Sequence, residues 1–358
     1  MRTIARTLLI ASTVVVTSVA LAAPASAAHG GQRTVRPGQS IQAAVDAARP
    51  GDTVVVLRGT YREQVRVSTD RVALRTRGVV TLMPPSSGGG RCDVIAPTGI
   101  CVLPRDLNVE GDQPTYTRRV SGVSIRGFRI VGFGAFGVFA FGSQGLRVSR
   151  VRAVDNGVYG IARFDSNDGY IRDSAASGSE EAGLYVGDSP QSHALVEHNR
   201  AWDNGYGIFV RHVHLATVRH NTVWANCLGV FLLDDGQPEG NGDNTVTRNT
   251  VRDNNRLCPA TDQAPALSGG GIVMYGSQRN RIERNTVLRN RGTTIASGGI
   301  VLLTAALTSG KGANGNLVTR NHALRNVPAD LVQDAGSTGN TVRRNRCATS
   351  IPAGLCWR

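Results

Sequence analysis

The chain has a single lysine, Lys311, only three methionines and no Cys-x-x-Cys pair. The missing Cys-x-x-Cys spacing argues against a thiol redox motif and against a zinc site built on such pairs. After residue 27, no apolar run approaches the roughly 18 residues that a membrane-spanning helix needs. Redox, zinc-binding and membrane-spanning classes are therefore disfavoured.

The first residues have the pattern of an export signal. A basic start at residues 1–6 precedes an apolar stretch at 8–23 and the small residues Ala25-Ser-Ala27. This order predicts a secretory signal peptide over residues 1–27 and a secreted, extracellular protein without a membrane attachment after cleavage. Loss of Arg2 and Arg6 would lower the formal net charge from +14 to +12.

Nearly all of the positive charge is carried by arginine. Its guanidinium group presents a planar fork of donors that suits carboxylates and phosphates. We therefore expect the partner to be an acidic polysaccharide or another cell-wall polyanion, and we do not expect nucleic acid. We also expect the protein to be a monomer. The alternative is that the arginines only solvate the outer faces of a repeat protein, because many recur at one repeat position.

Six cysteines in an exported chain indicate disulfides with structural roles. Their order suggests a short loop, a bridge between neighbouring repeats and a tied C-terminal end, with the pairs Cys92–Cys101, Cys227–Cys258 and Cys347–Cys356.

A repeat runs through the chain from Ser121 onward. Six strong copies have the form Val/Ile-x-x-Asn, with Asn199, Asn221, Asn249, Asn285, Asn321 and Asn345. The base period is near 23 residues with insertions, which is typical of a solenoid. If the coils stack in parallel, these asparagines form a ladder of amides that bond from coil to coil.

A second element, a glycine followed by an apolar strand, recurs at a steady distance after each copy, as at Gly183, Gly207 and Gly229. Each repeat thus offers two or three short strands, whose inner faces can be buried only by stacking. Before the repeats, residues 40–48 have the apolar face of a short amphipathic helix, which would cover the open end of the stack.

The run from Ile41 to Val67 resembles the opening of the right-handed parallel β-helix of the pectin-lyase-like superfamily, and the later repeats resemble its generic β-helix repeats. The resemblance covers nearly all of the mature chain. It implies an all-β fold, a single-stranded right-handed parallel β-helix of roughly ten coils with an N-terminal capping helix. The expected organisation is a signal peptide over 1–27, an N-terminal segment with the helix over 28–50, first coils over 51–120, regular repeats over 121–346 and a disulfide-tied cap over 347–358.

The fold hosts many activities, so an activity must come from residues that each enzyme branch needs. The Asp-Phe-Ile-Phe-Gly run of pectin methylesterases, the Asn-Thr-Asp-Gly and Gly-His-Gly runs of polygalacturonases, the Trp-Ile-Asp-His of pectate lyases and the Asp-Pro-His-Asp of one mannuronan epimerase branch are absent. These assignments are therefore disfavoured.

Alignment of the Gly-led strands places equivalent residues in outward columns. One column contains Phe139, Ala162, Tyr185, Phe209 and Phe231, and the next contains Phe141, Phe164, Gly187, Arg211 and Leu233. Just past the strand ends, titratable residues follow one another on four coils: Asp165, Asp188, His212 and Asp234.

A carboxylate column repels itself unless a cation lies among its members, so Asp165, Asp188 and Asp234 form a candidate Ca²⁺ site. In a polyuronate lyase or epimerase, a cation or an arginine neutralises the uronate carboxylate, and a base removes the C5 proton. The candidate catalytic residues are His212 as base, Tyr185 as acid or partner, and Arg211 with Asp188 at the carboxylate. The candidate substrate-binding residues are Arg163, Phe209, Phe231 and His214.

Insertions at 235–243, 256–270 and 304–315 would wall the same side of the molecule. Arg163 is unusual, because the repeat puts apolar residues at its inward position; either the strand bulges or Arg163 turns toward Asp165 or Asp188. The structural alternative is that the aspartates close turns and the aromatics stabilise the stack without a ligand.

Three hypotheses follow for the function. The first is a secreted enzyme that cleaves or epimerises an acidic polysaccharide, and the second is a non-catalytic surface protein that binds such a polyanion. The third is a periplasmic maturation factor of the nitrous-oxide-reductase accessory type, which the scarcity of methionine disfavours.

Overall fold

The computed structural model of the protein describes residues 30–358 except 88–89, 112, 263 and 357–358. The predicted signal peptide at 1–27 lies outside the described residues. Within them, no helix is long and apolar enough to cross a membrane.

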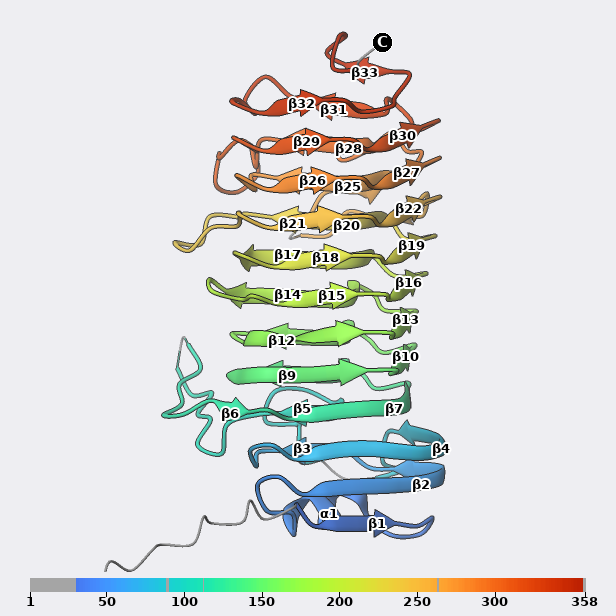
Figure 1. The fold of residues 1–358 in the computed structure, drawn as a ribbon, viewed down its shortest axis with the longest axis vertical. Coiled ribbons are helices and arrows are strands. Elements are labelled where there is room, and N and C mark those ends of the chain that lie inside the picture. Colours follow the sequence, from blue (N-terminus) through green and yellow to red (C-terminus); the bar gives the residue numbers. More distant parts are fainter. Residues whose placement is uncertain (1–29, 88–89, 112, 263, 357–358) are drawn as a thin grey trace, which may run out of the picture.

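The chain winds as a parallel β-helix whose coils stack along one long axis (Figure 1). One eleven-stranded sheet, called sheet B below, runs the length of the stack. Its strands, in spatial order, are β3 (Val65–Val67), β5 (Thr98–Val102), β8 (Phe136–Phe141), β11 (Tyr159–Phe164), β14 (Ala182–Ser189), β17 (Tyr206–Val213), β20 (Leu228–Leu233), β25 (Gly270–Tyr275), β28 (Gly298–Leu303), β31 (Leu331–Gln333) and β33 (Ser350–Ile351). The predicted parallel stacking is confirmed.

The remaining parallel strands form sheet A, which splits into two columns along most of the stack. Its first strands are β1 (Gln32–Val35), β2 (Thr53–Arg62), β4 (Ala73–Met83), β6 (Val120–Ser121) and β7 (Ser124–Val131). One column then contains β9 (Ser143–Ser149), β12 (Asn167–Arg172), β15 (Leu195–Glu197), β18 (Thr217–Arg219), β21 (Thr245–Thr247), β26 (Arg281–Glu283), β29 (Leu317–Thr319) and β32 (Thr341–Arg343). The other contains β10 (Arg152–Val154), β13 (Ala175–Ser177), β16 (Arg200–Trp202), β19 (Thr222–Trp224), β22 (Thr250–Arg252), β27 (Thr286–Leu288) and β30 (His322–Leu324).

Side chains with inward and outward directions alternate along each strand, so every second side chain points into the solenoid. The inner core is a continuous file of valine, isoleucine and leucine, with Val196, Val218 and Val246 fully buried on successive coils. Between the two columns of sheet A, the turn residues His198 and Arg248 adopt the left-handed conformation, and a buried asparagine follows each of them.

Those asparagines form the predicted ladder. The Asn221 side-chain amide donates to Asn249 Oδ1 at 2.9 Å and to Val196 O at 2.9 Å, and its own Oδ1 accepts from Asn199. The structure adds two further ladders that we did not predict. They contain Asn204, Asn226, Asn254, Asn290 and Asn326, and Asn244, Asn280, Asn316 and Asn340.

The N-terminal helix is shorter than the predicted 40–48. α1 (Ile41–Asp46) has six residues, begins after the N-cap Ser40 and ends at Ala47, because the chain turns there to enter β2. Glu63 accepts hydrogen bonds from the backbone N–H of Ile41 at 2.7 Å and satisfies the open helix start. The helix lies at the first-coil end of the stack (Figure 1), and its Ile41 is buried in the inner core.

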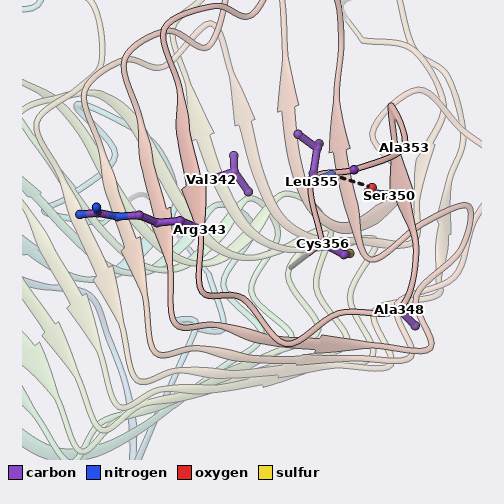
Figure 2. Close-up of a pocket in the computed structure, with 8 residues that line it drawn as sticks. Val342, Arg343, Ala348, Ser350, Ala353, Leu355 and Cys356 are labelled. Carbon is purple, nitrogen blue, oxygen red and sulfur yellow. Dashed lines mark hydrogen bonds between the residues drawn. The ribbon is translucent and has the colours of Figure 1, made fainter. Parts of the chain in front are cut away.

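All three predicted disulfides are present, as Cys92–Cys101, Cys227–Cys258 and Cys347–Cys356. The second of them fixes the insertion at 256–270, which also contains the antiparallel pair β23 (Leu257–Cys258) and β24 (Leu267–Ser268). The third lies at the last coil, beside a pocket of about 450 Å³. Figure 2 shows the residues that line this pocket, Cys356 among them. Val342 and Leu355 line that pocket, and the Leu355 N–H donates to Ser350 Oγ at 3.1 Å.

Candidate functional site

The strand register of sheet B agrees with the predicted columns. Tyr185 pairs with Ala162 on one side and with Phe209 on the other, and Phe209 pairs with Phe231. Gly187 pairs with Phe164 and Arg211 in the next column. Residues that follow these strands therefore lie at the same corner of the stack, on neighbouring coils.

The aromatic column is buried, which contradicts its predicted role as an open surface for sugar rings. Tyr185, Phe209 and Phe231 are 1%, 5% and 7% exposed and belong to a second apolar cluster on the outer face of sheet B. The rings cover one another, with centroids 4.4 Å apart between Phe164 and Tyr185 and 5.1 Å apart between Phe209 and Phe231. Tyr185 also lies over Gly187, which has no side chain to displace it.

A polar cluster does form at the ends of β14 and β17. Nδ1 of His212 lies 2.8 Å from Asp188 Oδ1, and its Nε2 contacts Asp235 Oδ1. Arg211 donates to Asp235 Oδ2 through Nε at 3.0 Å and Nη2 at 2.8 Å, and its Nη1 lies 3.8 Å from Asp188. This Asp188–Arg211–His212–Asp235 group is called the acid–base cluster below.

The cluster has a buried centre and an accessible edge. The His212 side chain is 2% exposed, whereas that of Asp188 is 41% exposed and that of Arg211 is 30% exposed. Both ring nitrogens face carboxylate oxygens, so the imidazolium form can donate to both. A ligand approaching the cluster would meet Asp188 and Arg211 first.

Burial and charge oppose each other at Asp235 and reinforce each other at Tyr185. Burial raises the pKa of Asp235, but hydrogen bonds and charge from Arg211 and His212 outweigh it and hold that pKa below its ordinary value. Burial, followed by the charge of Asp188, raises the pKa of Tyr185, although Arg211 opposes this. The Tyr185 hydroxyl therefore remains protonated at neutral pH.

The predicted calcium ligands do not converge. Asp234 is buried against Lys311, whose Nζ lies 3.1 Å from Oδ2, and is therefore neutralised by a cation of the chain itself. Asp165 accepts a 2.6 Å hydrogen bond from Tyr116 and a 2.6 Å one from Arg119. No group of three or more His, Cys, Asp or Glu side chains in the described part of the chain could hold a metal ion. The prediction of a Ca²⁺ site formed by Asp165, Asp188 and Asp234 is therefore wrong.

His214 holds a loop instead of facing a substrate. Its Nδ1 lies 2.8 Å from Asp243 Oδ2 and its Nε2 lies 2.8 Å from the Glu239 carbonyl. Arg279 pairs with the same Asp243 at 2.8 Å. These contacts fix the insertion at 235–243, and the Asp234–Lys311 pair links it to the insertion at 304–315.

Arg163 points into the solenoid and is 1% exposed, so it cannot bind substrate as predicted. It donates to the carbonyls of Ser166 at 2.9 Å and Asp168 at 2.6 Å, but its Nε and Nη1 have no partner. Burial lowers its pKa to about 10, although the charge of Asp168 opposes this. It turns neither to Asp165 nor to Asp188.

Sequence reasoning missed three members of this region, namely Asp235, Arg119 and Lys311. Asp235 stands next to the predicted Asp234, and the Asp234-Asp235 pair was the available signal. Arg119 and Lys311 come from segments outside the repeat, so the repeat pattern carried no information about them.

A family model described as a right handed beta helix region matches residues 136–305. No curated protein matches the chain in sequence. Among solved structures, an alginate lyase from Paenibacillus sp. str. FPU-7 is 13% identical with a TM-score of 0.56, covering 88% of this chain and 99% of the lyase. The A-module of a mannuronan C-5 epimerase from Azotobacter vinelandii is 16% identical with a TM-score of 0.54, covering 87% of this chain and 86% of that one.

A third similar structure is DFA-IIIase from Arthrobacter chlorophenolicus A6, which is 15% identical with a TM-score of 0.54 and covers 88% of this chain and 89% of its own. At these identities the similarity shows the fold alone. The chain is a right-handed parallel β-helix, as the sequence predicts.

Proposed function

We propose that this right-handed β-helix acts on an acidic polysaccharide outside the cytoplasm, by β-elimination or by C5 epimerisation of a uronate. The observation that carries the proposal is the acid–base cluster, in which an accessible arginine and carboxylate surround a buried imidazole. Three disulfides support the extracytoplasmic location.

The cluster contains groups suited to binding the uronate and to removing its C5 proton. Arg211 would pair with the uronate carboxylate and so acidify the C5 proton. In the neutral form of His212 the ring proton would lie on Nε2 toward Asp235, and a substrate carboxylate that displaced Asp188 would leave the unprotonated Nδ1 free to accept the C5 proton. Tyr185 stays protonated but is 1% exposed, so in this proposal it is a partner that positions Arg211 and Asp188 and does not reach the substrate.

The similar structures support the substrate class. The alginate lyase and the mannuronan epimerase are named for reactions on a polyuronate. DFA-IIIase carries a different name on a similar fold, so the fold alone would not select this substrate.

A second candidate is a non-catalytic protein that binds the same kind of polyanion. Two observations favour it: both nitrogens of His212 are occupied by carboxylates, and Phe209 and Phe231 are buried.

The test is incubation of the protein with polymannuronate, polyguluronate and polygalacturonate in deuterated water. Elimination would produce the ultraviolet absorbance of an unsaturated uronate, and epimerisation would place deuterium at C5. His212→Ala should lower the rate by about 1,000-fold, whereas His322→Ala, on β30 of sheet A, should not change it. Binding without product or deuterium on any of the three polymers would reject the enzyme and favour the second candidate.

A further inference from the structure

A column of mostly basic side chains, with one aspartate among them, runs along the corner between the two columns of sheet A. Every turn at this corner contains one residue in the left-handed conformation, with φ between 50° and 56°. From the first regular coil to the last, these residues are Arg150, Asp173, His198, His220, Arg248, Arg284, Arg320 and Arg344. The turns stack directly above one another (Figure 1), since their strands pair coil to coil.

The last four members, Arg248, Arg284, Arg320 and Arg344, are called the arginine edge. All four are exposed, and none forms a salt bridge within the described residues. The left-handed conformation favours asparagine, aspartate and glycine, so arginine is not needed at these positions for the backbone. The four side chains lie on consecutive coils about 4.8 Å apart, and Arg284 and Arg320 act on Glu283 only through their charge.

The acidic residues beside this corner are already paired with other arginines. Glu197 bonds Arg219 at 2.8 Å, and Glu283 bonds Arg281 at 2.8 Å. The equivalent residue at another corner behaves differently, because Arg289 is neutralised by Asp253 at 2.8 Å. At the arginine edge, four consecutive coils thus carry an arginine without a salt bridge among the described residues, whereas Arg289 at the other corner has one.

The same corner is hollowed toward the earlier coils. A groove of about 560 Å³ is lined there by Arg150, Arg152, Arg200, His198 and His220, with Asp173 as the acidic residue. The imidazoles of His198 and His220 stack with centroids 5.0 Å apart. Burial lowers the pKa of His220, and the charges of His198 and Arg248 lower it further, which places these side chains in one another's field.

We propose that an extended acidic polysaccharide lies along this corner, with successive carboxylates on the arginine edge and its continuation in the groove. This site is separate from the acid–base cluster and does not depend on catalysis there. The rise per coil along the solenoid axis, about 4.8 Å, is close to the length of one pyranose residue in an extended chain. A polymer with one carboxylate per sugar would therefore offer one carboxylate to each arginine. The polymer would relieve the repulsion among the stacked guanidinium groups.

A polysaccharide fits this corner better than a single-stranded nucleic acid. Sites for single strands combine a basic groove with aromatic platforms on which the bases stack. The column has no phenylalanine, tyrosine or tryptophan among its members. Its planar groups are guanidinium forks, which suit carboxylates in a bidentate geometry.

The test measures binding of hexamers of mannuronate and galacturonate to the full chain at low salt. Replacing the arginine edge by alanine at all four positions should weaken binding by about tenfold or more and reduce its salt dependence. The control removes four exposed arginines that form no salt bridge elsewhere in the described chain, Arg36, Arg62, Arg77 and Arg325, and should weaken binding by less than about threefold. Circular dichroism would verify that both variants fold.

The ring-proton resonances of His198 and His220 locate the ligand independently. Addition of the hexamer should shift them and leave that of His193, at a different corner, in place. An equal loss of affinity in both quadruple variants, or unshifted His198 and His220 signals, would overturn the proposal. Tighter binding of a single-stranded oligodeoxythymidine than of either hexamer would overturn the choice of polysaccharide. Turnover of a uronate disaccharide should be unaffected by the arginine-edge variant, which separates this site from the acid–base cluster.

Discussion

The ring of Tyr185 occupies the space that a side chain at Gly187 would need, two residues along the same strand. A Cβ at position 187 would overlap the Tyr185 hydroxyl. Because the backbone at this glycine is ordinary extended strand, the requirement is one of space and not of conformation. Because Gly187 has no side chain, the Tyr185 ring can lie flat against the sheet, buried beside Arg211 and Asp188.

Gly187→Ala should therefore displace the Tyr185 ring and lower the free energy of unfolding by about 1–3 kcal/mol. Urea unfolding measures the loss, and solvent perturbation of tyrosine absorbance reports the exposure of the ring. Gly134→Ala is the control, since a Cβ there would meet its nearest neighbour at an ordinary 3.6 Å. Unchanged stability and absorbance in Gly187→Ala would mean that Tyr185 has another place to lie.

The acid–base cluster should make stability depend on pH through Asp235. Its pKa is held below the ordinary 3.8, so the folded protein releases this proton more readily than the unfolded chain. The resulting stabilisation is fully present above pH 3.8 and is lost as the pH falls through the depressed folded value. Asp235→Asn should cost about 2 kcal/mol at neutral pH and markedly less in acid, below the depressed pKa of Asp235.

Urea unfolding of both proteins at neutral and at acid pH measures this difference. Asp203→Asn is the matched control, because Asp203 is exposed and forms no salt bridge within the described residues. A deficit in Asp235→Asn that persisted undiminished in acid would show that the carboxylate charge is not its cause.

The asparagine ladder should be the most sensitive part of the stack. Asn221→Ala would leave the buried N–H of Asn199 without its partner and would remove the amide bonds to Val196 and Asn249, at a cost of about 3 kcal/mol in unfolding free energy. Asn167→Ala, on β12 outside the ladders, should change it by less than about 0.5 kcal/mol. Thermal unfolding compares the two variants, and equal losses would contradict a special role of the ladder.

The sequence predicts the fold and the register well, because both depend on a pattern that repeats. The period near 23 residues places Asp188 and His212 on adjacent coils, and the structure joins them at 2.8 Å. The two unpredicted ladders also had a signal, since Asn204 follows Asn199 by five residues and Asn244 precedes Asn249 by five.

The sequence predicts the site less well, because the site depends on contacts outside the repeat. An insertion follows Leu233, and the backbone of Asp234 bonds Tyr275, so Asp235 takes the place expected for its neighbour. Periodicity cannot choose between two adjacent aspartates. Nor can it show that the aromatic side chains of neighbouring coils cover one another, which decides whether Phe209 is exposed.

Arg163 is the remaining local conflict, a charged residue at an inward position where the neighbouring coils have Ala140, Val186 and Val210. Its depressed pKa of about 10 means that holding the charge in the core costs roughly 3 kcal/mol, since each pKa unit corresponds to about 1.4 kcal/mol. The two hydrogen bonds that it donates to backbone carbonyls offset about 2 kcal/mol of this.

Arg163→Met should therefore raise the free energy of unfolding by about 1 kcal/mol at neutral pH. Methionine fits, because Met274 is buried at the equivalent position of a later coil. The gain should shrink above about pH 10, where the folded protein sheds the proton that the unfolded chain retains. Arg163→Ala should instead lose about 2 kcal/mol or more through the cavity that it leaves. Urea unfolding at neutral and alkaline pH measures both variants; a loss in Arg163→Met as large as that in Arg163→Ala would show that the guanidinium bonds, and not the volume, hold the turn at 164–168.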